Sequence, residues 1–94
     1  MAQMQEIGAL VGRASTGNGE AAFELGMAYS TGSGGVSYDL IQAHRWFNVA
    51  TLCGYAPAAA WRQEIAAEME RQDVVEAQRL ARATVVPIQH RKAA

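Results

Sequence analysis

Few side chains in this 94-residue chain have the types and the spacing that catalysis or metal binding requires. His44 and Cys53 lie nine residues apart, which is about 13 Å along a helix and too far for a nucleophile and its base. The second histidine, His90, has no cysteine or histidine beside it at the spacing of metal ligands. We therefore expect no catalytic residue, no metal site and no cofactor, and we do not expect an enzyme.

Two further patterns have the appearance of sites. Glu64, Glu68 and Glu70 lie near Arg62 and Arg71, and charge pairing on a solvated helix face explains this spacing more simply than paired catalytic carboxylates. The glycines between positions 32 and 35 follow an expected helix, whereas a phosphate-binding loop follows a strand and carries a lysine or serine in register. We interpret both patterns as structural.

Apolar residues recur at helical spacing along most of the chain, which predicts an all-α protein of about five helices. The expected ranges are 2–14, 19–30, 39–52, 57–71 and 73–84. Asn18 and Asp39 are expected N-caps, and Gln42 stands where it completes a capping box with Asp39. Asp73 begins the fifth helix, and Glu76, three residues later, gives the same capping-box spacing. Pro87 is expected to break it, which leaves residues 87–94 as a flexible tail.

The most informative pattern lies between Leu25 and Gly54 and describes two antiparallel helices packed at close range. Gly26 removes a side chain where the second helix approaches, and Trp46 is expected to fill the wedge between the helices. The residues expected to build this arrangement are Leu25, Gly26, Tyr29, Gly32, Gly34, Asp39, Ala43, Trp46, Ala50 and Gly54. None of them is expected to do chemistry.

These residues, together with Ala21 and Val36, resemble the marked positions of the Sel-one-like repeats, relatives of the tetratricopeptide repeats. The chain differs by one extra glycine in the turn and by Thr51 in place of a second alanine. The resemblance implies a short α/α solenoid of antiparallel helix pairs that acts in protein–protein contact. It divides a single domain, residues 1–86, into an N-terminal capping helix (1–18), one repeat (19–55) and a degenerate capping helix pair (56–86).

Composition limits the partners and the compartment. A net charge of −1 gives no electrostatic reason to expect nucleic acid or an anionic membrane. No apolar run approaches the length of a membrane span, and the first 14 residues lack the order of a signal peptide. The single cysteine excludes an internal disulfide. We expect a cytoplasmic protein.

The resemblance favours an adaptor that presents a helical groove to a peptide or protein partner. In such repeats the first helix of each pair lines the concave side. The residues expected there are Glu24, Met27, Ala28, Thr31, Trp61, Arg62 and Ile65. Trp61 is the main candidate anchor, because tryptophan and arginine most often dominate binding energy, and packing in the core is its alternative role.

Two other functions remain open. The chain could form a homodimer through apolar residues at its ends, for which the candidates are Ile7, Leu10, Val11, Val74, Val75 and Leu80. It could also bind a small molecule or act as an enzyme, although no constellation of polar residues points to this. The terminal Ala93-Ala94 is similar to tags that bacterial unfolding proteases recognise, and an ordinary frayed end is the alternative.

Overall fold

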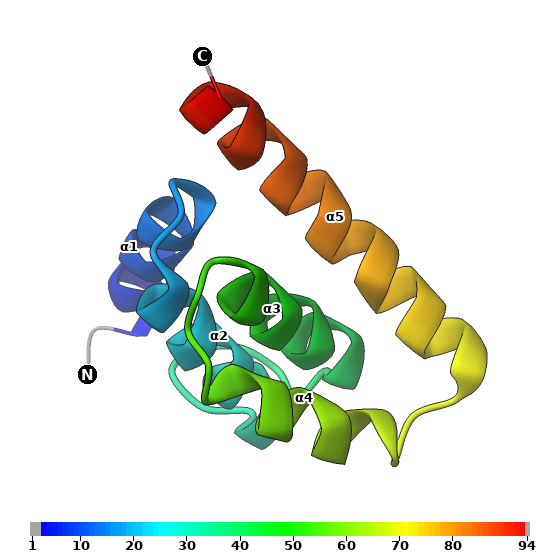
Figure 1. Ribbon diagram of the computed structural model, residues 1–94. Helices are drawn as coiled ribbons and strands as arrows, with labels where there is room; N and C mark the ends of the chain where they lie inside the picture. Colours follow the sequence, from blue (N-terminus) through cyan, green and yellow to red (C-terminus); the bar gives the residue numbers. More distant parts are fainter. Residues whose placement is uncertain (1–2, 94) are drawn as a thin grey trace.

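Five α-helices form almost all of the computed structural model, which describes the backbone of residues 3–93 and the side chains of residues 6–88. They are α1 (Gln3–Ser15), α2 (Gly19–Thr31), α3 (Leu40–Leu52), α4 (Ala58–Ala66) and α5 (Arg71–Ala93), shown in Figure 1. The protein is all-α, and α1, α2 and α3 begin and end within one residue of the expected positions. Ala94 of the expected degradation tag and the side chain of His90 lie outside the described residues.

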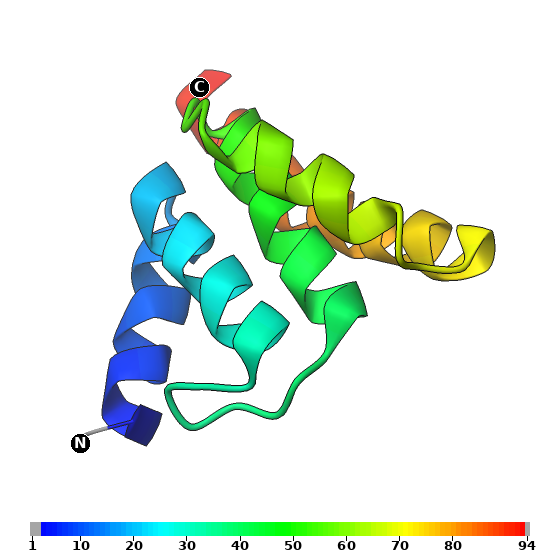
Figure 2. The same ribbon diagram turned by 90° about the horizontal axis from the view of Figure 1, so that it is seen from below.

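The helix α3 is the one against which most of the others pack. α2, α4 and α5 all contact it, while α1 packs chiefly on α2. Figure 2 shows α1, α2 and α3 side by side, with α4 and α5 beyond α3. The shared core is rich in alanine, whose small side chain permits short distances between helix axes. Its buried members are Ala14, Ala21, Ala22, Leu25, Ala43, Trp46, Phe47, Val49, Ala50, Ala58, Ile65, Ala81 and Val85.

The closest helix approach lies where Gly26 of α2 faces α3. A Cβ atom placed on Gly26 would lie 2.5 Å from Cδ1 of Phe47, so no side chain fits there. Phe47 is fully buried and occupies the position between the helices that the sequence analysis assigned to Trp46. Trp46 is also buried, and the guanidinium of Arg45 lies 4.3 Å from the centre of its ring.

Glycine and an N-cap shape the turn between α2 and α3. Gly32 has a φ of 70° and ends α2, and its amide donates to the carbonyl of Ala28 at 2.8 Å. Asp39 caps α3, because its Oδ1 accepts from the amide of Gln42 at 3.1 Å. The expected capping box is only half formed, since the amide of Asp39 donates to the carbonyl of Tyr29 instead of to the Gln42 side chain.

The ten residues expected to build the helix pair divide into core and turn positions. Those in the core are Leu25, Gly26, Ala43, Trp46 and Ala50, Tyr29 is half-buried, and those exposed at turns and helix ends are Gly32, Gly34, Asp39 and Gly54. The residues in the core therefore carry the packing, and the exposed ones set where the helices stop.

The last two helices differ from expectation. α4 ends at Ala66 and not near Arg71, and α5 begins at Arg71, two residues before Asp73. Glu76 does not complete a capping box with Asp73, because its carboxylate accepts hydrogen bonds from Arg79 at 2.7 and 3.0 Å. α4 and α5 each pack on α3 more than on one another, and they diverge from the turn that joins them in Figure 1.

The expected end of the fifth helix near Thr84 is wrong, because α5 continues through Pro87 to residue 93. A proline inside a helix removes one hydrogen bond and costs about 3 kcal/mol. Val85 and Ile88, on either side of the proline, are each 4% exposed. Burying two such side chains contributes about 3–6 kcal/mol, which offsets the proline. Residues 87–93, expected to form a tail, are therefore helical.

Candidate functional site

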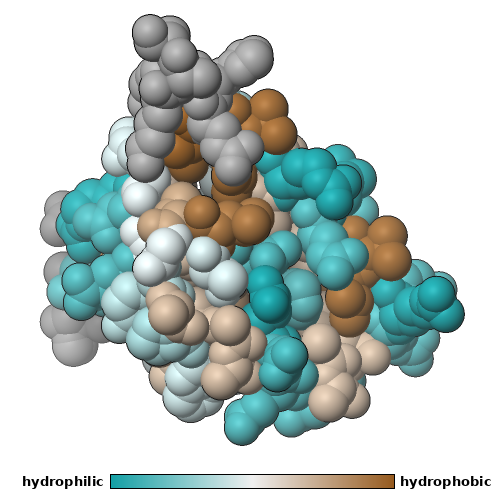
Figure 3. All heavy atoms as spheres, in the orientation of Figure 1, coloured by the Kyte–Doolittle hydropathy of each residue, from teal (hydrophilic) through white to brown (hydrophobic). Residues whose placement is uncertain are grey.

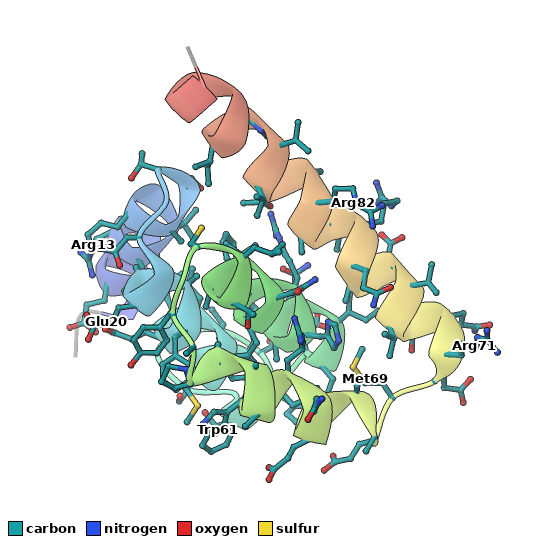
Figure 4. The ribbon with its side chains drawn as sticks, in the orientation of Figure 1. Arg13, Glu20, Trp61, Met69, Arg71 and Arg82 are labelled. Atoms are coloured by element: carbon teal, nitrogen blue, oxygen red, sulfur yellow. The ribbon has the colours of Figure 1, made fainter. Side chains whose placement is uncertain are left out.

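The side chain of Trp61 lies at the surface of α4 and is anchored from behind by other rings. Its ring stacks on Phe47 at 6.2 Å between centroids and meets Phe23 edge-on at 6.5 Å. It is nevertheless 41% exposed. Figure 4 shows it projecting from α4 on the side away from α5. A large ring held in place by the core and open to solvent is available to a partner at little entropic cost.

Trp61 borders a groove formed by two adjoining hollows, which we name the Trp61 groove. The first, of about 210 Å³, is lined by Ser30, Thr31, Tyr38, Leu40, Trp61, Glu64, Ile65 and Glu68. The second, of about 350 Å³, is lined by Tyr38, Asp39, Leu40, Ile41, Glu68, Met69, Glu70 and Asp73. The hollows share Tyr38, Leu40 and Glu68 and therefore adjoin. Trp61 lines the first hollow and Met69 lines the second, and both are labelled in Figure 4.

The structure brings three of the seven expected partner-binding residues into this groove. Thr31 and Trp61 are exposed on its walls, whereas Ile65 is only 7% exposed and belongs to the core behind it. The hydroxyl of Thr31 donates to the carbonyl of Met27 at 3.0 Å, which fixes its direction at the end of α2.

The other four expected residues do not line the groove. Ala28 is buried in the core, and Met27 is half-buried against it. Arg62 turns toward α3, where its Nη1 donates to Oδ1 of Asn48 at 2.8 Å. Glu24 is exposed on α2 but lies outside both hollows.

Sequence reasoning missed Tyr38 and the two glutamates of α4 and the turn after it. Tyr38 is 61% exposed and lines both hollows. Trp61, Glu64 and Glu68 have the spacing i, i+3 and i+7, which is that of a single helix face and could have revealed a shared surface. The expected ion pairs of these glutamates with Arg62 and Arg71 are not found among the described residues, where the ion pair present is Arg79–Glu76.

His44 is the most unusual titratable group in the described part of the chain. It lies on α3, is 2% exposed, and its Nδ1 has no hydrogen-bond partner among residues 6–88. Burial, together with the nearby positive charge of Arg62, lowers the pKa of His44 below that of an ordinary histidine. Within the described residues no three His, Cys, Asp or Glu side chains gather as metal ligands would. His44 is therefore part of the helix packing, where burial favours its neutral form.

The lowered pKa of His44 predicts a pH-dependent stability. Between the folded pKa and about 6.5, the unfolded chain binds a proton at this site and the folded chain does not. The stabilisation is complete above about pH 6.5 and is lost as the pH falls below it. We expect the melting temperature to fall from pH 7.5 to pH 5.5, and His44→Gln to reduce this fall.

The companion variant is His90→Gln, which removes the other histidine and measures how much of the pH dependence arises outside position 44. Melting temperatures measured by circular dichroism at several pH values in one buffer series provide the comparison. Equal pH dependence in the parent and in His44→Gln would show that another group titrates in this range.

A separate hollow, of about 470 Å³, lies between α3 and α5. It is lined by Asn48, Leu52, Gln78, Arg82, Val85 and Val86. Leu52 and Val86 are 52% and 47% exposed. In Figure 3 the hydrophobic atoms on this side of the molecule form separate patches with hydrophilic atoms between them. Of the apolar residues expected at open ends, Ile7, Leu10 and Val11 pack against the core instead.

The search for a membrane-spanning helix and the comparisons with known proteins add no further functional assignment. Within residues 3–93, no helix combines the length and the apolarity needed to cross a bilayer. A comparison with protein-family models found no match. A comparison with curated proteins found no significant match either.

Proposed function

We propose that this protein is a non-catalytic interaction module that holds a peptide or protein segment in the Trp61 groove. The observation that carries the proposal is the placement of Trp61, whose ring packs on Phe47 and Phe23 and is still 41% exposed at the groove. Tryptophan is among the residues that contribute most to binding when a partner covers them. The resemblance of residues 21–54 to Sel-one-like repeats supports the same function and does not establish it.

The groove has the composition of a peptide-binding surface. Its apolar contacts come from Leu40, Ile41 and Met69, and polar residues surround them. A central apolar contact with a polar rim is the usual arrangement at protein interfaces.

A cytoplasmic location belongs to the same proposal. The single cysteine of the chain excludes an internal disulfide, which fits a reducing compartment.

The test is a selection of displayed random 16-residue peptides on the purified protein, with Trp61→Ala for counter-selection. We expect enriched peptides whose affinity falls at least tenfold on Trp61→Ala, since removing a central aromatic anchor costs about 2 kcal/mol or more. Leu52→Ala, which truncates an exposed apolar residue outside the Trp61 groove, should not change their affinity. Circular dichroism confirms that each variant is folded. Peptides that bind Trp61→Ala as well as the parent would refute the proposal.

Self-association is a second candidate, because the hollow between α3 and α5 exposes Leu52 and Val86. Two copies could bury these side chains against each other about a two-fold axis. Light scattering during size-exclusion chromatography, over a range of micromolar concentrations, distinguishes a dimer from a monomer. A mass that stays at one chain would exclude this candidate.

A further inference from the structure

Many carboxylates line the Trp61 groove, although the net charge of the whole chain is only −1. The acidic residues that line it are Asp39, Glu64, Glu68, Glu70 and Asp73, five of the nine in the chain. No lysine, arginine or histidine is among the described residues that line either hollow. The groove therefore carries a local excess of negative charge even though the chain as a whole is almost neutral.

Among residues 6–88, whose side chains the structure describes, no arginine forms an ion pair with these carboxylates. Arg62, although adjacent to Trp61 in sequence, is turned toward α3 and bound to Asn48. Arg71 projects from the start of α5 in Figure 4 and does not line the groove. The ion pair found among the described residues, Arg79–Glu76, lies outside both hollows. Asp39 caps α3, and the carboxylates of Glu64, Glu68 and Glu70 are exposed and so accessible to a cation from outside.

The aromatic residues of the groove favour the same kind of ligand. Tyr38 and Trp61 are the exposed rings of the first hollow, at 61% and 41% exposure. The face of an aromatic ring attracts lysine and arginine side chains. The protein already uses this contact elsewhere, where Arg45 lies over the ring of Trp46 at 4.3 Å. A surface that combines aromatic rings and carboxylates favours a ligand that carries positive charges beside apolar side chains.

We infer that the occupant of the Trp61 groove is a cationic segment of a partner protein, with lysine or arginine residues around an apolar side chain. The apolar side chain lies against Leu40 and Met69, and the cations lie beside the rings and the carboxylates. Opposite charges across the groove accelerate association and reject acidic segments. Nucleic acid is excluded from this surface because its phosphates would meet the same carboxylates. This inference rests on the proposed function.

The test uses the same 16-residue library, with the charge of the enriched peptides as the first readout. We expect peptides with a net positive charge whose affinity for Glu64→Gln/Glu68→Gln is at least about tenfold weaker than for the parent. Glutamine keeps the shape of glutamate, so this double variant removes charge without removing packing. The matched control is Glu6→Gln/Glu20→Gln, which changes the net charge equally at exposed positions of α1 and α2 outside the groove, and should bind as the parent does.

Salt provides the second readout. Affinity should fall between about 50 and 300 mM sodium chloride for the parent, and should fall much less for Glu64→Gln/Glu68→Gln, because screening acts on the charges that the variant lacks. Fluorescence of Trp61, recorded in a Trp46→Phe background that is shown to be folded, reports binding at the groove itself.

Three results would overturn the inference, and they differ in what they leave standing. Neutral or acidic peptides that depend on Trp61 would refute the cationic ligand and keep the proposed function. Enriched peptides without dependence on Trp61 would refute both. Self-association that is lost in Glu64→Gln/Glu68→Gln would show that the occupant is a second copy of this chain and not a partner protein.

Discussion

Gly26→Leu is expected to lower the free energy of unfolding by several kcal/mol and to leave little folded protein at 37 °C. Even the first atom of a side chain at this position would lie 2.5 Å from the ring of Phe47. Phe47 cannot move aside easily, because it is fully buried and packs against the rings of Phe23 and Trp61. Overpacking a core costs about 1–3 kcal/mol for small additions, and leucine adds four carbon atoms. Thermal and urea unfolding measure the loss.

A double-mutant cycle separates this contact from the helix propensity of position 26. Gly26→Ala gains about 1 kcal/mol of propensity but places a Cβ against Phe47. Phe47→Leu gives that atom room. We expect the pair to be more stable than the sum of the two single changes predicts by about 0.5–3 kcal/mol, the usual range for residues in contact. Additive effects would show that the two residues do not meet.

Trp46→Ala should have a comparable effect, because the side chain is only 3% exposed and its removal leaves a large cavity. Truncation of a buried aromatic residue costs about 3–5 kcal/mol. Total stabilities are about 5–15 kcal/mol, so the variant is expected to be only marginally folded. The loss of the Arg45 contact on the ring adds to the cost.

The comparison for this variant is Trp61→Ala, the same truncation at a residue that is 41% exposed. We expect a clearly smaller loss of stability, since much of that ring is in water in both the folded and the unfolded state. Urea unfolding monitored by circular dichroism gives both values. Equal losses at positions 46 and 61 would mean that the two tryptophans contribute to the core alike.

The parts of the fold that could be predicted are those set by local sequence. Apolar spacing identified α1, α2 and α3, because an amphipathic helix must present one face to its neighbours. The N-caps at Asn18 and Asp39 could be recognised as well, and Asn18 accepts from the amide of Ala21 at 3.0 Å. Both caps need only the residues that follow them in sequence.

The parts that could not be predicted depend on distant residues. Pro87 is a local signal for a helix end, but the burial of Val85 and Ile88 outweighs it. Similarly, the apolar spacing of residues 57–84 predicts two helices, but it does not reveal that both pack on α3. Local preference is a weak predictor wherever tertiary packing provides several kcal/mol.

The candidate site shows the same division. Trp61 could be singled out from its residue type, whereas Tyr38 lies in a turn and joins the groove only because the chain brings that turn beside α4. The glutamates at 64 and 68 were interpreted as members of surface ion pairs, since sequence does not reveal that Arg62 turns toward Asn48. A groove between segments cannot be derived from any one of them.

The central position of α3 has a consequence for how the protein unfolds. In a linear repeat array each unit touches only its neighbours, so terminal units can melt by themselves. Here α2, α4 and α5 all rest on one helix, and α5 reaches back to α1. Detaching any of the three exposes a face of α3 and weakens the support of the other two. We therefore expect α2, α3, α4 and α5 to unfold as one cooperative unit, without the tolerance to shortening that long solenoids have.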